Sequence, residues 1–218
     1  MSAISDLYET TVGKKALMAV TGVILFGFVV VHLLGNLQIF QGPERLNRYA
    51  ELLRRAGSLL WVARGVLLFS VGVHILAAVQ LTVRNWRARP QRYAKRRYRE
   101  ADYAARTMVW SGPVVAAFIA YHLLHLTLGT VHPDFDPADV YGNVVTAFRA
   151  WPVALAYVVA NALLAFHLYH GLWSLFQSLG LNHPDYNRWR RVAAAASAVA
   201  IGAGNIAIPV AVLTGMVR

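Results

Sequence analysis

Six histidines lie inside long apolar runs of this sequence, where ionisable side chains are costly and usually belong to a site. A neutral imidazole can bind a metal through one ring nitrogen, and two imidazoles that face each other are the axial ligands of a six-coordinate haem iron. One such histidine is more often a packing residue, but six together indicate ligand chemistry. They are His32, His74, His122, His125, His167 and His170, whereas His132 and His183 fall between the runs.

The apolar runs that carry these histidines predict an all-α integral membrane protein. The chain has 218 residues, of which 57% are hydrophobic and 14% are charged, and its mean hydropathy is +0.45. At about 1.5 Å per residue, each of five runs is long enough to cross a hydrocarbon core of about 30 Å. We expect one membrane domain over residues 1–218, in which the first four helices form an antiparallel haem-binding bundle. The five transmembrane helices are expected at residues 16–40, 59–83, 107–130, 152–178 and 192–217.

The distribution of charge predicts the orientation of these helices. Basic residues cluster before the first run (Lys14 and Lys15), between the second and third (84–106), and before the fifth (188–191). By the positive-inside rule these three regions and the N-terminus are cytoplasmic, and the C-terminus is outside. Four arginines in the first outer loop, within 45–55, depart from this pattern. The net charge of +11 therefore indicates a basic membrane face for anionic lipid or an acidic partner protein, and not a nucleic-acid-binding surface.

The depth of the histidines along the helices sorts them into two layers. Measured from the cytoplasmic side, His32 lies about 24 Å and His122 about 22 Å along its helix. His74 lies about 14 Å and His167 about 16 Å along. Each layer joins diagonal helices of a sequentially wound bundle. Two haems stacked across the membrane are therefore expected, with His32 and His122 on the outer iron and His74 and His167 on the inner iron.

Other residues near these positions are expected to surround the haems. His125 and His170 each follow a ligand position by three residues, and spacing alone does not choose between the neighbours. Arg64 can neutralise a haem propionate, or extend its guanidinium to the membrane interface. Small residues suit either a flat ring or ordinary helix contact, and they are Gly27, Gly35, Gly72 and Gly171.

The remaining segments carry weaker signals. The absence of cysteine excludes disulfides, cysteine-bound iron–sulfur clusters and thioether-attached haem in this chain. The stretch "GAGNIA" at residues 202–207 predicts close helix packing, because no strand precedes it as a dinucleotide site requires. The outer segment "PERLNRYAELLRRAG" predicts a short interfacial helix, and "HPDFDPADVYGN" predicts turns.

The quoted histidine segments resemble a known family. They are "VVVHLLGNLQIF", "SVGVHILAAVQL", "AFIAYHLLH" and, above all, "FHLYHGLWSLFQSLG" with its His and Gly-Leu-Trp-Ser pattern. Over essentially its whole length the chain resembles the single-chain, five-helix, di-haem cytochrome b membrane anchor of succinate dehydrogenase and fumarate reductase, respiratory complex II. The resemblance puts the ligand of the third helix on His122 and that of the fourth on His167, which gives the same two pairs as depth.

The resemblance also implies a function and partners. A flavoprotein subunit, which carries out the succinate–fumarate chemistry, and an iron–sulfur subunit would dock on the cytoplasmic face of a bacterial inner membrane. This chain would supply no catalytic residue and would pass electrons through two haems b to a membrane quinone, which the resemblance to di-haem members implies is menaquinone. Asn36, Gln38 and Glu44 are expected near the quinone by position alone. The glutamate that some members use for proton transfer is replaced by Ala165 here, so that proton path is not expected.

Two alternatives stay open from the sequence. The first keeps both haems and changes the partner to a hydrogenase, a formate dehydrogenase or no partner, but neither "FHLYHGLWS" nor the short termini favour it. The second is a transporter or proton channel with a histidine relay. None of the five expected spans contains aspartate or glutamate, which disfavours a coupled-ion mechanism.

Overall fold

The computed structural model describes residues 8–88 and 103–218, and these residues are helical with no strand among them. The described helices fall into a longer and a shorter set. The longer helices are α2 (Thr11–Asn36), α4 (Ser58–Arg87), α5 (Tyr103–His122), α7 (Trp151–Ser178) and α8 (Pro184–Leu213). The shorter ones are the 3₁₀ helix η1 (Leu37–Gln41), α3 (Pro43–Arg55), the π-helical turn η2 (Leu123–Thr127) and α6 (Val140–Arg149).

Five of these segments are long and apolar enough to cross a membrane, which confirms the expected number of spans. They are Thr11–Gln41, Ser58–Arg87, Arg106–Thr127, Trp151–Ser178 and Pro184–Leu213. Each coincides with an expected run, although the fifth helix begins at Pro184, well before residue 192. Proline at the first helical position suits that start because its missing N–H is not needed there.

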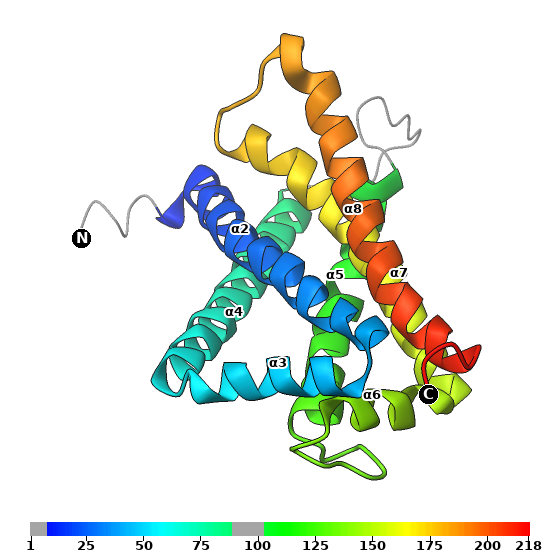
Figure 1. Ribbon diagram of the computed structural model, residues 1–218. Coiled ribbons are helices and arrows are strands. Elements are labelled where there is room, and N and C mark those ends of the chain that lie inside the picture. Colours follow the sequence, from blue (N-terminus) through cyan, green and yellow to red (C-terminus); the bar gives the residue numbers. More distant parts are fainter. Residues whose placement is uncertain (1–7, 89–102) are drawn as a thin grey trace.

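The five long helices pack in pairs. The closest contacts join α7 with α8, α2 with α4 and α5 with α7, and α2 also packs on α7 and α8. In Figure 1, α2 and α4 cross, whereas α7 and α8 run alongside each other. Among the described helices α4 makes its close contacts with α2, so α4 is less enclosed than α7. Helices α2 and α5, and helices α4 and α7, are not among these closely packed pairs, so side chains can meet between them.

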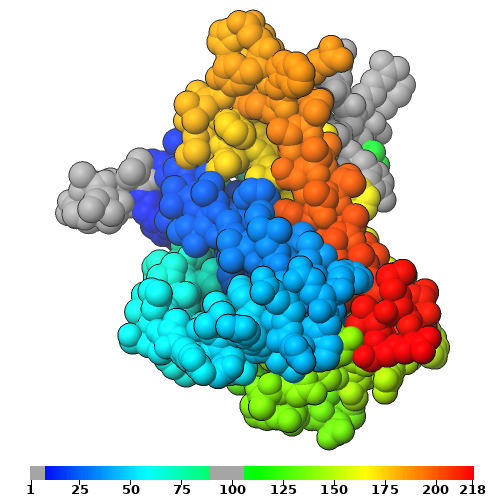
Figure 2. Space-filling view, viewed as in Figure 1, coloured from blue at the N-terminus to red at the C-terminus, as the bar shows by residue number. Residues whose placement is uncertain are grey.

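One end of the molecule is closed by α3, α6 and the C-terminal residues (Figures 1 and 2). We call it the outer end, and the opposite end the inner end, after the topology expected from charge. A buried apolar core including Ile39, Leu46 and Phe148 lies here. Asn47 of α3 ties the two short helices together, because its side chain bonds to Asp139 Oδ1 at 2.8 Å and accepts the Tyr141 N–H at 2.9 Å.

The interfacial helix expected after the first span is present as α3, but the expectation of turns in the second outer loop is partly wrong. Turns and bends occupy residues 129–138, and α6 then begins at Val140. The Asp139 side chain starts α6 by accepting the Gly142 N–H at 2.9 Å, which is a regular helix N-cap. Asp139 therefore begins a helix in a segment whose sequence predicts only turns.

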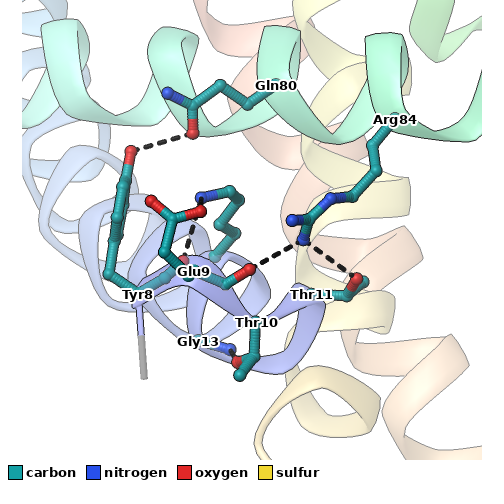
Figure 3. A network of polar contacts seen from close by, with 8 residues as sticks. Tyr8, Glu9, Thr10, Thr11, Gly13, Gln80 and Arg84 are labelled. Carbon is teal, nitrogen blue, oxygen red and sulfur yellow. Dashed lines mark hydrogen bonds and ion pairs between the residues drawn. The ribbon is translucent and has the colours of Figure 1, made fainter. Parts of the chain in front are cut away.

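At the inner end, polar contacts join the start of α2 to the end of α4 (Figure 3). Tyr8 donates its hydroxyl to Gln80 Oε1 at 2.9 Å, and Arg84 donates to the Glu9 carbonyl oxygen at 2.9 Å. Lys14, expected at the membrane surface, is only 5% exposed and donates to the Tyr8 carbonyl oxygen at 2.9 Å. Most of the basic loop at 84–106 lies outside the described residues.

The close packing expected of "GAGNIA" is confirmed on α8. A Cβ atom added at Gly202 would lie 2.8 Å from Cβ of Ala165 on α7, and one at Gly204 would lie 3.0 Å from Leu33 on α2. Such contacts are too short for a side chain at Gly202, since Ala165 has no flexible end that can move aside. Small residues at such positions are typical of membrane helix contacts.

Replacing Gly202 by leucine should therefore separate α8 from α7. We expect Gly202→Leu to lower the free energy of unfolding by about 2 kcal/mol, the usual cost of overpacking. Ala203→Leu is the matched control, because Ala203 faces outward from the same turn of α8. Thermal unfolding in detergent measures both, and an equal loss in the two variants would contradict this packing.

Candidate functional site

At the outer level, one histidine from α2 meets one from α5. The ring centroids of His32 and His122 lie 5.8 Å apart, and their planes are inclined at 81°. Both rings are half-buried. His122 is the last residue of α5, and Phe28, one turn before His32, stacks on the His32 ring at 5.2 Å. The structure thus brings together the two residues expected in the outer layer.

At the inner level, α4 and α7 contribute the second pair. The His74 and His167 ring centroids lie 6.3 Å apart, with planes inclined at 58°. Helix α2 spans both levels, because Thr21 contacts His74 and His32 follows Thr21 by eleven residues. That spacing separates the two pairs by about 16 Å along the helix. The two expected layers are therefore present in the positions of the rings, although depth along the separate helices predicts them only about 6–10 Å apart.

His74 is oriented by a contact from α2. Its Nδ1 lies 3.1 Å from Thr21 Oγ1, which itself lies 2.9 Å from the Leu17 carbonyl oxygen. Because the single hydroxyl hydrogen of Thr21 is directed to that carbonyl, its oxygen is free to accept the Nδ1–H of His74. This arrangement leaves Nε2 of His74 unprotonated, which is the form that a metal-binding imidazole takes.

At the outer level, Tyr157 of α7 lies between two histidines. Its hydroxyl is 3.0 Å from His125 Nδ1 and 3.4 Å from His122 Nδ1, and the tyrosine is only 4% exposed. If His122 donates to the Tyr157 oxygen and Tyr157 donates to His125, the hydroxyl and both Nδ1 atoms have a partner, and Nε2 of His122 is left unprotonated. Tyr157 was not predicted from the sequence, where a tyrosine in an apolar run suggests only packing.

His125 belongs to this supporting set and does not face His32. It lies in the π-helical turn η2, is 1% exposed and stacks on Tyr121 at 5.1 Å. On its other side, the His132 ring lies at 5.2 Å. His132 is held by the Asn143 carbonyl oxygen at 2.9 Å. Single π-helical turns are frequent at functional sites, and this one was not expected from the sequence.

The other residues expected near the haems have varied surroundings. His170 lies near Trp173, with ring centroids 6.4 Å apart, and Arg64 places its guanidinium 4.8 Å from the centre of the Trp61 ring. Beside Gly171, one turn after His167, a Cβ atom would meet nothing within 4 Å. The same is true of Gly27 and Gly72.

Gly35 does not offer this open space. A Cβ atom there would lie 2.6 Å from the ring of Tyr49 on α3. Helix packing, the other role considered for this glycine, accounts for it.

The three residues expected near the quinone do not share one depression. Asn36 ends α2, one turn beyond His32, and Gln38 lies in η1. Glu44 lines a shallow polar pocket on α3 with Asn47, Arg48, Glu51, Arg54 and Ala138. A role for all three in one site stays a prediction.

The side chains present fit a pair of haems in three respects. Two imidazoles bound to one iron at the usual metal–nitrogen length of about 2 Å have ring centroids about 6 Å apart, and both pairs have this separation. Within the described chain no three metal-ligating side chains gather to hold a bare ion, so a pair needs a group that brings its own equatorial ligands. Finally, the open space at Gly171, one turn after His167, leaves room for a flat ring. The buried Nδ1 of His167 has no hydrogen-bond partner among the described residues, and an iron bound at Nε2 would give it none.

Comparisons with known proteins identify no relative. No family model, no curated protein and no solved structure matches the chain. The function must therefore be inferred from the histidine pairs and the groups around them.

Removing the Tyr157 hydroxyl should destabilise the outer level. In Tyr157→Phe, His125 and His122 lose a buried partner, and we expect the free energy of unfolding to fall by about 1–3 kcal/mol. Tyr169→Phe is the matched control on the same helix, since its hydroxyl makes no hydrogen bond among the residues that the structure describes. Denaturation of both variants without added haem measures the difference, and equal stability would contradict the bridging role of Tyr157.

Proposed function

We propose that this chain is the di-haem cytochrome b membrane anchor of a succinate:quinone oxidoreductase, the enzyme called succinate dehydrogenase or fumarate reductase. The observation that carries the proposal is the presence of two facing histidine pairs at two depths of one helical membrane protein. The His32–His122 pair would hold an outer haem b and the His74–His167 pair an inner one. The sequence resemblance supplies the partner enzyme.

Within this proposal, the residues of the chain hold and orient the cofactors. When bound, each haem supplies reversible one-electron transfer. Thr21 keeps the His74 ring in the tautomer whose Nε2 is free, and Tyr157 can do the same for His122. Such hydrogen bonds to the second ring nitrogen fix ring orientation and raise ligand basicity. The apolar helices around both levels exclude water.

The charge of the chain supports the proposed partners. Among the described residues, the inner end carries Arg84, Arg87 and the arginines within 188–191, which would face the cytoplasm, and an iron–sulfur subunit bearing the flavoprotein would dock there. The membrane quinone, which we take to be menaquinone, would accept the electrons at the outer end. The dicarboxylate chemistry would belong entirely to the flavoprotein. The proposed location is the bacterial cytoplasmic membrane.

The second candidate function is that of a di-haem cytochrome b subunit of a hydrogenase or formate dehydrogenase. Such a subunit would use the same two histidine pairs. The distinguishing feature is "FHLYHGLWS" at residues 166–174, which favours complex II. A histidine-relay transporter is disfavoured, since the rings occur as two separate pairs about 16 Å apart and no acidic side chain lies in the expected spans.

The haem assignment is tested by optical spectra. We expect the purified chain to show a b-type α-band in the dithionite-reduced minus oxidised spectrum. His167→Ala should lose about half of the α-band because one of two haems loses an axial ligand, whereas the control His170→Ala should retain both haems. A wild-type chain with no α-band, or haem loss in His170→Ala alone, would contradict the assignment.

The partner enzyme is tested by co-purification. With a tag on this chain and gentle detergent extraction, we expect a flavoprotein and an iron–sulfur protein to co-purify with succinate-dependent reduction of a naphthoquinone. A variant with alanine at both His74 and His167 should keep the partners and lose quinone reduction. Co-purification of a hydrogenase or formate dehydrogenase subunit instead would transfer the proposal to that enzyme.

A further inference from the structure

An apolar groove runs along the outer half of the molecule between α5 and α7. Its volume is about 650 Å³, and its walls include Ala117, Phe118 and Tyr121 from α5 and Trp151 and Ala156 from α7. This volume lies within the range of small-molecule sites in proteins, which is about 300–1,000 Å³. Because both walls belong to membrane-spanning helices, a ligand would enter the groove from the lipid.

The groove lies next to the outer histidine pair, with the Phe118 side chain between them. Phe118, in its wall, has its ring centroid 5.9 Å from that of His122. The same phenyl ring packs on Tyr157 at 4.9 Å. Tyr121, which also lines the groove and carries a hydroxyl, stacks on His125 with ring centroids 5.1 Å apart. A molecule in the groove would therefore contact the rings that surround His122.

The Tyr121 hydroxyl is the distinctive polar group of the groove. Unlike Tyr157, it makes no hydrogen bond within the described part of the chain, and Tyr121 is only half-buried. A hydroxyl at bilayer depth without a partner is costly, because the hydrocarbon around it offers no acceptor. A lipid-soluble ligand with a carbonyl oxygen would satisfy it, whereas an acyl chain would not.

We propose that this groove binds the headgroup of an isoprenoid quinone, with the Tyr121 hydroxyl donating a hydrogen bond to a quinone carbonyl oxygen. The inference rests on the proposed function and adds to it the site of the quinone. Phe118 and Trp151 supply flat apolar surfaces for the ring, and the open side of the groove admits the isoprenoid tail. The pocket around Glu44 is lined mainly by charged side chains at the aqueous surface, which do not suit such a tail.

Filling the groove tests the site directly. The probe is a tritiated naphthoquinone with a two-unit isoprenoid tail, and its saturable binding to the full haem-loaded chain is measured by equilibrium dialysis against protein-free micelles. We expect Ala156→Trp to weaken binding at least tenfold, because the indole occupies the groove. Val199→Trp is the matched control, since Val199 is 68% exposed on α8 away from the groove, and it should bind as the wild type does.

Removing the hydroxyl tests the polar contact. We expect Tyr121→Phe to weaken binding about fivefold to tenfold, the effect of one lost hydrogen bond, with an unchanged haem spectrum. Unchanged binding in Ala156→Trp together with loss in Asn36→Leu or Gln38→Leu would overturn the groove and leave the proposed function standing. A wild-type chain that carries two haems but binds no quinone would overturn both the groove and the quinone-reducing function.

Discussion

An imidazole at the depth of the hydrocarbon core must find its partner inside the protein, because lipid offers neither hydrogen bonds nor ligands. Five of the six histidines in the spans show how this constraint is met. His125 is held by Tyr157 and His74 by Thr21. His32 and His122 face each other, as do His74 and His167. Each facing pair is what an axially ligated haem requires, and the proposed function is built on that pairing.

Contacts between the helices hold the segments that carry the histidines in place. Glycines on α8 let it approach α7 and α2 closely, so these two helices, which each contribute to both histidine levels, are supported from behind. At the inner end, contacts from Tyr8 and Arg84 hold α2 against α4 near Thr21 and His74. At the outer end, α3 and α6 cover the bundle. Helices α2 and α5 are not closely packed on each other, nor are α4 and α7, and the histidine rings meet between them.

Much of this could be predicted from the sequence, since membrane spans depend on long apolar runs and the depth of a histidine depends only on helical rise. The five spans and the two levels come from those simple rules. The rest depends on tertiary contacts that no local pattern reveals. Tyr157 is important because its hydroxyl contacts the His125 ring in η2 and the His122 ring at the end of α5. Lys14 is buried by the segment before it, and Gly35 accommodates Tyr49 from another helix. The start of α6 did have a local signal, the N-cap aspartate Asp139, which was treated as part of a turn.

The pairing of the histidines is tested most directly by counting haems in double variants of the purified chain. The account predicts two haems per wild-type chain and one in the double variant His32→Ala/His122→Ala, because both changes affect the same iron. It predicts none in His32→Ala/His74→Ala, because each change removes a ligand from a different iron. Two haems retained in either double variant, or equal haem loss in both, would contradict the account.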